Sequence, residues 1–172
     1  GWEHPDFCHL PMVMGNDGHK LSKRHGATSC NEFRNNGYLK EAIINYVAML
    51  GCSYEEGRDM FSLQELGERF KPEHINKAPA IFDYKKLEWF NGQYMRLKTD
   101  EELFDLTWPF IANSGIFGEQ DQKAREAAGL RFADQTLLKP TDEQKAMLMK
   151  VMPLIKERLH FLTEAPQMVR FL

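Results

Sequence analysis

The stretch GNDGHKLSKRHGA, from Gly15 to Ala27, places three glycines around a cluster of basic side chains. Glycine permits backbone shapes in which several amide groups point at one anion. Lysine side chains act as mobile charges on phosphate oxygens, and Ser22 adds a hydroxyl group. These residues predict a loop that binds phosphate, although a solvated surface turn would have a similar composition.

The spacing within this stretch excludes one common phosphate-binding motif. A Walker A loop requires a glycine followed directly by lysine and then by serine or threonine. Here Gly18 is followed by His19, Lys20 and Leu21, so that motif is absent. The function of the loop therefore has to be inferred from the order of its own residues.

The chain has the composition of a folded protein rather than that of a general nucleic-acid coat protein. Of its 172 residues, 42% are hydrophobic and 27% are charged, and its formal net charge is −3. These values predict a packed core in one ordinary domain or two small ones. Because the net charge is negative, an anionic partner is expected to bind at particular points. No window approaches the roughly 18 apolar residues of a membrane span, so no membrane partner is expected.

The three cysteines form neither a zinc motif nor close pairs. Cys8, Cys30 and Cys52 are an odd set, and we expect them to be reduced thiols in a cytoplasmic protein. A metal site could be assembled from Cys8, Cys30 and nearby histidines, but the spacings match none of the common zinc patterns. We therefore expect no metal site. The first residues, GWEHPDFCHL, do not form a signal peptide and look like the interior of a longer protein.

Helical signals dominate the chain after the basic stretch. Apolar residues recur on one face of Tyr38–Leu50, and Gly51 follows as a stop. Capping boxes predict three later helix starts, and Asp83 is expected to cap a helix over residues 84–97. The predicted fold is mainly α, with a short strand over DFCHLPMVM and a soft boundary near residues 95–100. The boxes are Ser62 with Glu65, Thr99 with Glu102, and Thr141 with Gln144, and the apolar face consists of Leu39, Ala42, Ile43, Tyr46, Val47 and Leu50.

The string KLSKR, from Lys20 to Arg24, resembles the KMSKS signature of the class I aminoacyl-tRNA synthetases. The longer string DGHKLSKRHGA is similar to the glutamyl-tRNA synthetase version of that signature. Three later segments also look like this family, in the same order along the chain, and the resemblance covers mainly residues 1–100. The segments are GYLKEAIINYVAMLG (Gly37–Gly51), EGRDMFSLQEL (Glu56–Leu66) and FDYKKLEWFNGQYMR (Phe82–Arg96).

The resemblance implies three regions. Residues 1–30 would be the end of a class I catalytic α/β domain that carries the KMSKS-type loop. Residues 31–96 would form the helical stem-contact region, and residues 97–172 would begin the α-helical anticodon-binding domain. The chain would then be an internal or C-terminal piece of a synthetase. It contains no His-Ile-Gly-His-type ATP motif, so we expect this piece alone to be unable to make glutamyl-adenylate.

The resemblance also implies a reaction and its partners. The family uses ATP to convert glutamate to glutamyl-adenylate, and it then transfers the glutamyl group to the 3′ end of tRNA(Glu). Negative charge grows on the departing pyrophosphate, so cations placed there lower the barrier. Lys23 would hold the β- and γ-phosphates with help from Lys20, which makes these two lysines the candidate catalytic residues. Partners would be ATP with Mg²⁺, L-glutamate and tRNA(Glu), in a monomeric enzyme, and the ATP-binding residues would be Lys20, Leu21, Ser22, Lys23 and Arg24.

The helical region would contact tRNA mainly through phosphates and 2′-hydroxyls. Each candidate lysine or arginine could instead belong to a solvated helix face. Trp89 and its neighbouring aromatic residues could stack on bases, but the helical spacing of Leu87, Phe90, Tyr94 and Leu97 favours a core stripe. The candidate tRNA contacts are Lys77, Lys85, Lys86, Arg96 and Lys98.

Two other interpretations fit part of the sequence. A non-catalytic helical module that binds tRNA would contain the same helices. A glutamyl-queuosine-type relative would usually lack an anticodon-binding domain, so the helical sequence after Arg96 argues against it. These residues leave open whether such an enzyme charges only the glutamate tRNA or also the glutamine tRNA.

Overall fold

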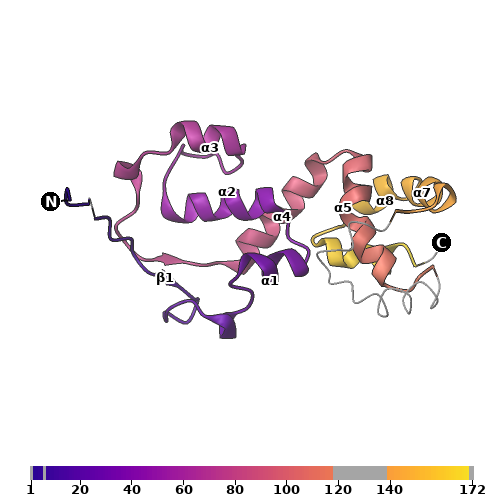
Figure 1. Cartoon of the computed structure of the whole chain (residues 1–172), viewed down its shortest axis with the longest axis horizontal. Helices are drawn as coiled ribbons and strands as arrows, with labels where there is room; N and C mark the ends of the chain where they lie inside the picture. Colours follow the sequence, from indigo (N-terminus) through magenta and orange to yellow (C-terminus); the bar gives the residue numbers. More distant parts are fainter. Residues whose placement is uncertain (1, 6, 118–138, 171–172) are drawn as a thin grey trace.

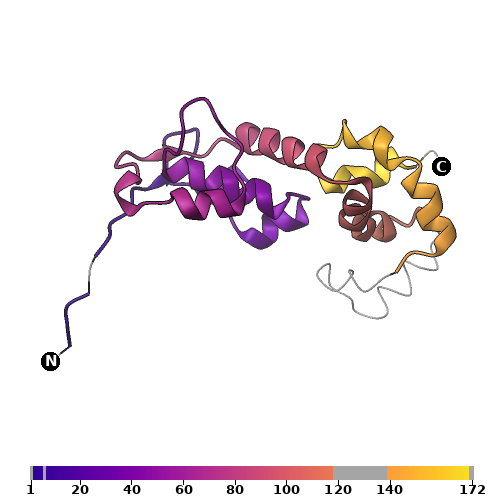
Figure 2. The ribbon, with the colours of Figure 1, turned by 90° about the horizontal axis from the view of Figure 1, so that it is seen from above.

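The computed structural model describes residues 2–5, 7–117 and 139–170, and it is mainly helical, as the sequence predicts. The elements are, in chain order, β1 (Val13–Met14), the 3₁₀ helix η1 (Lys23–His25), α1 (Cys30–Asn35), α2 (Lys40–Gly51), α3 (Leu63–Arg69), η2 (Pro72–His74), β2 (Ala80–Ile81), α4 (Tyr84–Leu97), α5 (Asp100–Asn113), α7 (Asp142–Met149), α8 (Met152–Lys156), η4 (Leu162–Glu164) and α9 (Ala165–Met168). Figures 1 and 2 show an elongated molecule with two halves, α1–α4 and α5–α9, that meet where α4 leads into α5.

Local capping signals place the helix starts where the sequence predicts them. The capping boxes at Ser62, Thr99 and Thr141 all form, and Asp83 accepts hydrogen bonds from the first backbone amides of α4. These side chains satisfy amide groups that have no partner within the helix itself. A further box, in which Ser29 starts α1, was not predicted.

Helices α2 and α4 pack against each other and form the centre of the first half. Helix α4 buries Leu87, Phe90 and Met95 completely, and Ala42 and Tyr46 face them from α2. Burial of such side chains contributes about 1.5–3 kcal/mol each, so this contact stabilises the half that carries the basic stretch.

The strands differ from the prediction in two ways: the first strand is shorter than expected, and a second strand is present. The predicted strand over DFCHLPMVM is reduced to Val13 and Met14. These residues pair in parallel with Ala80 and Ile81, a strand that the sequence analysis did not predict. The β1–β2 pair ties the chain just before the basic stretch to the chain just before α4. A long-range pairing of this kind leaves no local signal in a two-residue segment.

The second half shares a hydrophobic core with the first. Apolar residues of α5 pack against those of α7, α8 and the C-terminal turns, within one cluster that also contains the buried residues of α4. No described helix has the length and apolar character of a membrane span. The core residues of this half are Leu103, Phe104, Trp108, Ile111, Ala112, Leu148, Met152, Ile155, Leu159, Leu162, Ala165 and Val169.

Two details of the helix predictions are wrong. Val47 is 48% exposed and Leu97 is 71% exposed, although both continue the predicted apolar faces. Helical periodicity identifies a face but not how far the partner helix covers it, and Leu97 is the last residue of α4. Gly51 ends α2 as predicted, but Cys52 is the C-cap and Gly51 does not take a left-handed conformation.

A buried amide, Asn45 of α2, connects the helices to the segment before α3. Its Nδ2 donates to the carbonyl of Asp59 at 3.0 Å, and its Oδ1 accepts from the backbone amide of Phe61 at 2.8 Å. The hydroxyl of Tyr94 lies 2.7 Å from both Asn45 Oδ1 and the Phe61 carbonyl. Because Asn45 is fully buried, water cannot replace these bonds if the side chain is removed.

Replacement of Asn45 by alanine should lower the free energy of unfolding by about 2–3 kcal/mol, since it leaves a buried amide and a partly buried carbonyl without partners. Tyr94→Phe removes only the hydroxyl and should cost about 1 kcal/mol. Urea unfolding followed by circular dichroism measures both values. Equal losses for the two variants would contradict the central role of the Asn45 side chain.

Candidate functional site

The basic stretch folds back onto β1 through backbone hydrogen bonds. The amide of Gly15 donates to the carbonyl of His19 at 2.7 Å, and the amide of Leu21 donates to the carbonyl of Val13 at 3.0 Å. Lys20 also forms a bridge with Met14. The chain on either side of the turn is therefore fixed, and Lys20 starts from a defined position beside the strand.

Asp17 holds the inside of the loop together. Its Oδ1 accepts a hydrogen bond from the backbone amide of His19 at 3.0 Å, and its Oδ2 accepts one from Arg24 Nη2 at 3.2 Å. The same Oδ1 lies 3.0 Å from His25 Nε2, a close contact without the alignment of a hydrogen bond. The His19 amide and then the His25 ring hold the pKa of the Asp17 carboxyl below its usual value. Asp17 is thus the anionic anchor of a cationic loop.

The His25 ring connects Asp17 to Ser22. The backbone amide of Ser22 donates to His25 Nδ1 at 3.1 Å, and the Nε2 atom of the same ring lies beside Asp17. The ring also lies directly over Gly15, where an added Cβ would be 2.6 Å from His25 Cδ2. Only glycine fits at this position beneath the ring.

The end of the loop is anchored to two helices. The hydroxyl of Tyr84, the first residue of α4, donates to the carbonyl of Ala27 at 2.8 Å. Glu32 of α1 accepts hydrogen bonds from the backbone amides of Thr28 and Ser29, at 2.9 and 3.0 Å. These two amides hold the pKa of the Glu32 carboxyl below its usual value, and the charge of Lys23 lowers it further. The loop is therefore a fixed frame built on α1 and α4.

The structure brings the predicted ATP-binding residues together but gives them different surroundings. Lys20 and Lys23 are exposed, and neither has an ion-pair partner among the described residues. Leu21 packs partly against the core, and the Ser22 backbone binds the His25 ring. Arg24 forms an ion pair with Asp17, so it is not a free cation here. The loop thus presents two unpaired amines on a fixed frame.

The residues that build this frame have no specific signal in the sequence. Asp17, Gly15 and Tyr84 received no specific role, because each acts through a contact that exists only after the loop has folded. The glycine and the Asn-Asp-Gly turn were visible as loop signals, but the contact of Asp17 with Arg24 seven residues later has no sequence signature.

The candidate tRNA contacts also divide into two groups. Lys77 and Lys85 are exposed and have no ion-pair partner in the described parts of the chain. Three other candidates have internal carboxylate partners: Lys86 with Asp59 at 3.4 Å, Arg96 with Glu157 at 3.3 Å and Lys98 with Glu41 at 2.9 Å. Lys98 is moreover a half-buried structural residue, whereas Lys85 is available to a ligand. The expected stripe of Leu87 and Phe90 is buried, but Trp89 is 44% exposed.

A family model for the catalytic domain of class I tRNA synthetases (E and Q) matches residues 1–89. The chain belongs to this family. The synthetase chain is 76% identical over 172 residues to the glutamate–tRNA ligase of Treponema denticola, with 100% of this chain and 34% of that protein covered. It is 46% identical over 170 residues to the corresponding ligase of Borreliella burgdorferi, with 99% and 31% covered. It thus spans about a third of the length of the curated relatives it matches.

Solved structures of the family agree with the fold. The glutamate–tRNA synthetase of Elizabethkingia anophelis gives a TM-score of 0.68 at 28% identity and covers 99% of this synthetase chain and 33% of its own. A glutamate–tRNA ligase of Elizabethkingia meningosepticum, solved in complex with its amino acid, gives a TM-score of 0.66 at 28% identity, with 96% of this chain and 32% of that chain covered.

The described part of the synthetase chain contains no group of three or more His, Cys, Asp or Glu side chains arranged to hold a metal. Its three cysteines are free thiols, with Cys52 buried and the other two exposed.

Replacement of Gly15 by alanine should disrupt the loop, because the new methyl group would overlap the His25 ring. NMR spectra should show displaced His25 and Asp17 side-chain signals and an Asp17 pKa closer to its ordinary value. Gly67→Ala is the matched control, since nothing lies within 4 Å of an added Cβ there. Unchanged His25 signals in the Gly15 variant would contradict the geometry of this loop.

Proposed function

We propose that the chain is part of a glutamate–tRNA ligase and that its loop from Gly15 to Ala27 binds the phosphates of ATP during glutamate activation. The observation that carries the proposal is the pair of unpaired lysines, Lys20 and Lys23, on a frame held by Asp17 and His25. The 76% identity to a glutamate–tRNA ligase supports the same assignment. Residues 1–30, 31–96 and 97–172 are then the end of the catalytic domain, the stem-contact region and the beginning of the anticodon-binding domain.

In the proposed reaction a carboxylate oxygen of glutamate attacks the α-phosphorus of ATP. A new oxygen–phosphorus bond forms, the bond from the α-phosphorus to the bridging oxygen breaks, and pyrophosphate leaves with that electron pair. Lys23 binds the β- and γ-phosphate oxygens and Lys20 assists, so both cations stabilise the charge that moves onto the leaving group. Leu21 anchors the loop, while Ser22 shapes its backbone and Arg24 can exchange Asp17 for phosphate.

The Mg²⁺ that accompanies ATP does not fit this loop as a protein-bound ion. Mg²⁺ is bound through carboxylate, phosphate and water oxygens. The loop offers lysine amines, and its one carboxylate, Asp17, is already bound by Arg24 and the His19 amide. No step assigned to this chain therefore passes through the metal, which phosphate oxygens would hold.

We further propose that Lys77 and Lys85 bind tRNA phosphates, with additional contacts from Lys86 and Arg96. Lys77 and Lys85 carry the stronger case, because they are exposed and free of ion pairs in the described structure. Contacts to phosphates and sugars suit A-form RNA, because protein side chains cannot read the bases in its deep, narrow major groove.

Replacement of Lys23 by alanine in the complete ligase should reduce glutamate-dependent ATP–pyrophosphate exchange by about 10²–10³ without loss of fold, because one charge on the leaving group is lost. The assay is run with tRNA present, and circular dichroism checks the fold. Lys71→Ala removes an exposed lysine outside the loop and is the matched control.

Normal exchange by the Lys23 variant would end the assignment of the loop. The 172-residue chain alone is expected to show no exchange, because it contains no His-Ile-Gly-His-type motif. Exchange by this chain would show that the remaining two thirds of the ligase is not needed for activation.

Replacement of Lys85 by glutamate should weaken tRNA binding by the ligase and reduce the slope of log K against log salt by about 1, since one phosphate contact is lost. Filter binding over a range of salt concentrations measures this slope, and Lys71→Glu controls for the change in net charge. An unchanged slope would remove Lys85 from the interface.

A further inference from the structure

The two halves of the chain meet at a second place besides the covalent turn between α4 and α5. The segment between α1 and α2, residues 36–39, lies against residues 160–163 before and within η4. The backbone amide of Leu162 donates to the carbonyl of Gly37 at 3.1 Å. We call this contact between residues 36–39 and residues 160–163, together with Asn91 of α4, the joint. It connects the half that carries the lysine loop to the half that contains α5–α9.

Asn91 of α4 binds the backbone of both halves at the joint. Its Oδ1 accepts from the amide of Leu39 at 2.7 Å, and its Nδ2 donates to the carbonyls of His160 and Gly37 at 2.6 and 3.3 Å. The side chain is fully buried. One amide therefore satisfies polar groups from chain segments that are far apart in sequence, and an apolar residue at this position would leave them unpaired.

Gly37 sets the spacing of the joint. An added Cβ would lie 2.7 Å from the backbone nitrogen of Leu162 and 2.8 Å from that of Thr163, and the φ angle of Gly37 is +85°. Both obstacles are backbone atoms, which cannot rotate away as a side chain can. Only glycine permits so close an approach with a left-handed backbone. The separation of the two halves is thus fixed by backbone contact.

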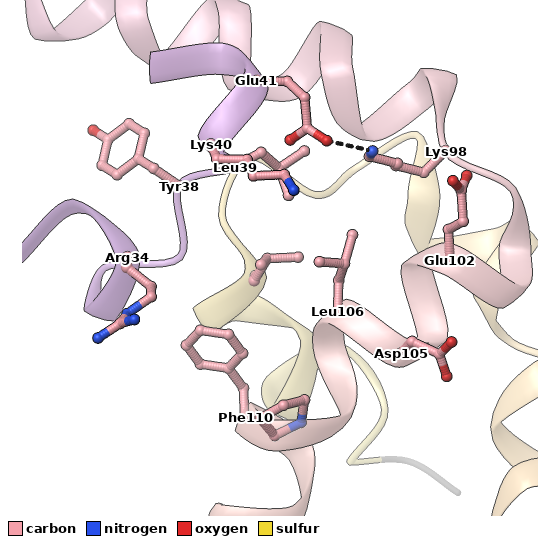
Figure 3. Close-up of a pocket in the computed structure, with 12 residues that line it drawn as sticks. Arg34, Tyr38, Leu39, Lys40, Glu41, Lys98, Glu102, Asp105, Leu106 and Phe110 are labelled. Atoms are coloured by element: carbon pink, nitrogen blue, oxygen red, sulfur yellow. Dashed lines mark hydrogen bonds and ion pairs between the residues drawn. The ribbon is translucent and has the colours of Figure 1, made fainter. Parts of the chain in front are cut away.

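An ion pair closes the other side of the joint. A cavity of about 610 Å³ lies there, lined by residues of both halves that include Tyr38, Leu106 and Phe110 (Figure 3). Glu41 of α2 and Lys98, just after α4, meet at its rim with 2.9 Å between carboxylate and amine, as the dashed line in Figure 3 shows. The cavity leaves space into which the two halves could bend. On this side of the joint, packing alone therefore does not fix the angle between the halves.

We infer that Asn91, Gly37 and the Glu41–Lys98 ion pair are positioning residues that hold the lysine loop and the C-terminal helices at one angle, so that an RNA bound to both halves is presented correctly to the loop. The inference rests on the proposed function, because it needs a ligand that contacts both halves. In the proposed function ATP contacts this chain at the lysine loop, which lies within the first half, so the KM for ATP serves as the internal control.

The length of α4 shows why the angle matters. Its 14 residues form a lever of about 20 Å at about 1.5 Å per residue. A rotation of about 10° at the joint would move the far end of such a lever by about 3–4 Å. A misplacement of about 1 Å at a reacting centre can cost about 10²-fold in rate. Even a small change in the joint should therefore affect the transfer of glutamate to tRNA.

A charge-swap experiment in the complete ligase tests the ion pair. Lys98→Glu places a second carboxylate beside Glu41, at a cavity that Glu102 and Asp105 also line, and should lower kcat/KM for tRNA about 3- to 30-fold, with the KM for ATP unchanged. Glu41→Lys combined with Lys98→Glu restores opposite charges with their positions exchanged and should return kcat/KM for tRNA to within about threefold of the original value.

Two results would overturn the inference. If the swapped double variant stays as defective as Lys98→Glu, Lys98 acts by direct contact with RNA rather than through Glu41. If the single variant changes the KM for ATP as much as that for tRNA, the pair does not act on orientation. A ligase that fails to charge tRNA with glutamate before any substitution would instead contradict the proposed function, and the distance measurement below would still test the joint.

A distance measurement tests the joint without any assay of activity. Spin labels are placed on Cys30 and on the new thiol of Leu154→Cys, since both positions are exposed, and Cys8→Ser removes the other exposed thiol while Cys52 stays buried. The chain and its Gln93→Glu control should give the same narrow distance distribution, because Gln93 lies on α4 but its side chain makes no hydrogen bond among the described residues. Asn91→Asp keeps the shape of the side chain, removes both donated bonds and should broaden or shift the distribution.

An unchanged distribution in a folded Asn91→Asp chain would contradict the role of the joint. If circular dichroism shows that this variant does not fold, Lys98→Glu is labelled in its place, and the same two outcomes decide.

Discussion

The structure depends on the burial of one face of α4 against both halves of the chain. Leu87 and Phe90 pack against α2, and the same hydrophobic cluster continues into α5 and the C-terminal turns. Because the core face of α4 is held in this way, the side chains on the rest of the helix have fixed positions. Tyr84 at its first turn supports the end of the lysine loop, and Asn91 in its middle binds the joint. A single helix thus relates the loop to the distant C-terminal helices.

The helices were predictable because their signals are local. Ser62, Thr99 and Thr141 mark helix starts by contacts only three residues long, and the apolar face of α2 is visible as a repeat. The residues that connect elements were not predictable in this way. Asn45 and Asn91 are buried because of partners 14 to 69 residues away, and an asparagine in a helix is more often exposed. The exposure of Leu97 has the same origin, because a repeat cannot show where a neighbouring helix ends.

In the candidate site, too, some features can be predicted from the sequence and others depend on contacts in the folded chain. The order of residues in KLSKR predicts which side chains belong to the loop, since that order resembles a family signature. The order does not reveal which cations are already occupied. Asp17 binds Arg24 and lies against His25, whereas Lys20 and Lys23 have no such partner among the described residues. That difference depends on the folded turn, in which Asp17 and Arg24 meet although seven residues separate them.

A rigid frame with mobile amines suits a leaving group that moves. In the proposed reaction, the negative charge on pyrophosphate grows as the bond to the α-phosphorus breaks, and the group departs from the reacting centre. A lysine stem with four rotatable carbons can follow that displacement, whereas a guanidinium held in a fixed fork cannot follow it as easily. The backbone bonds of Gly15 and Leu21 and the His25 ring fix where the two stems begin. Under the proposed function, the amines would need little reorganisation to reach the phosphates and would retain the freedom to track them, which would stabilise the transition state more than the bound substrate.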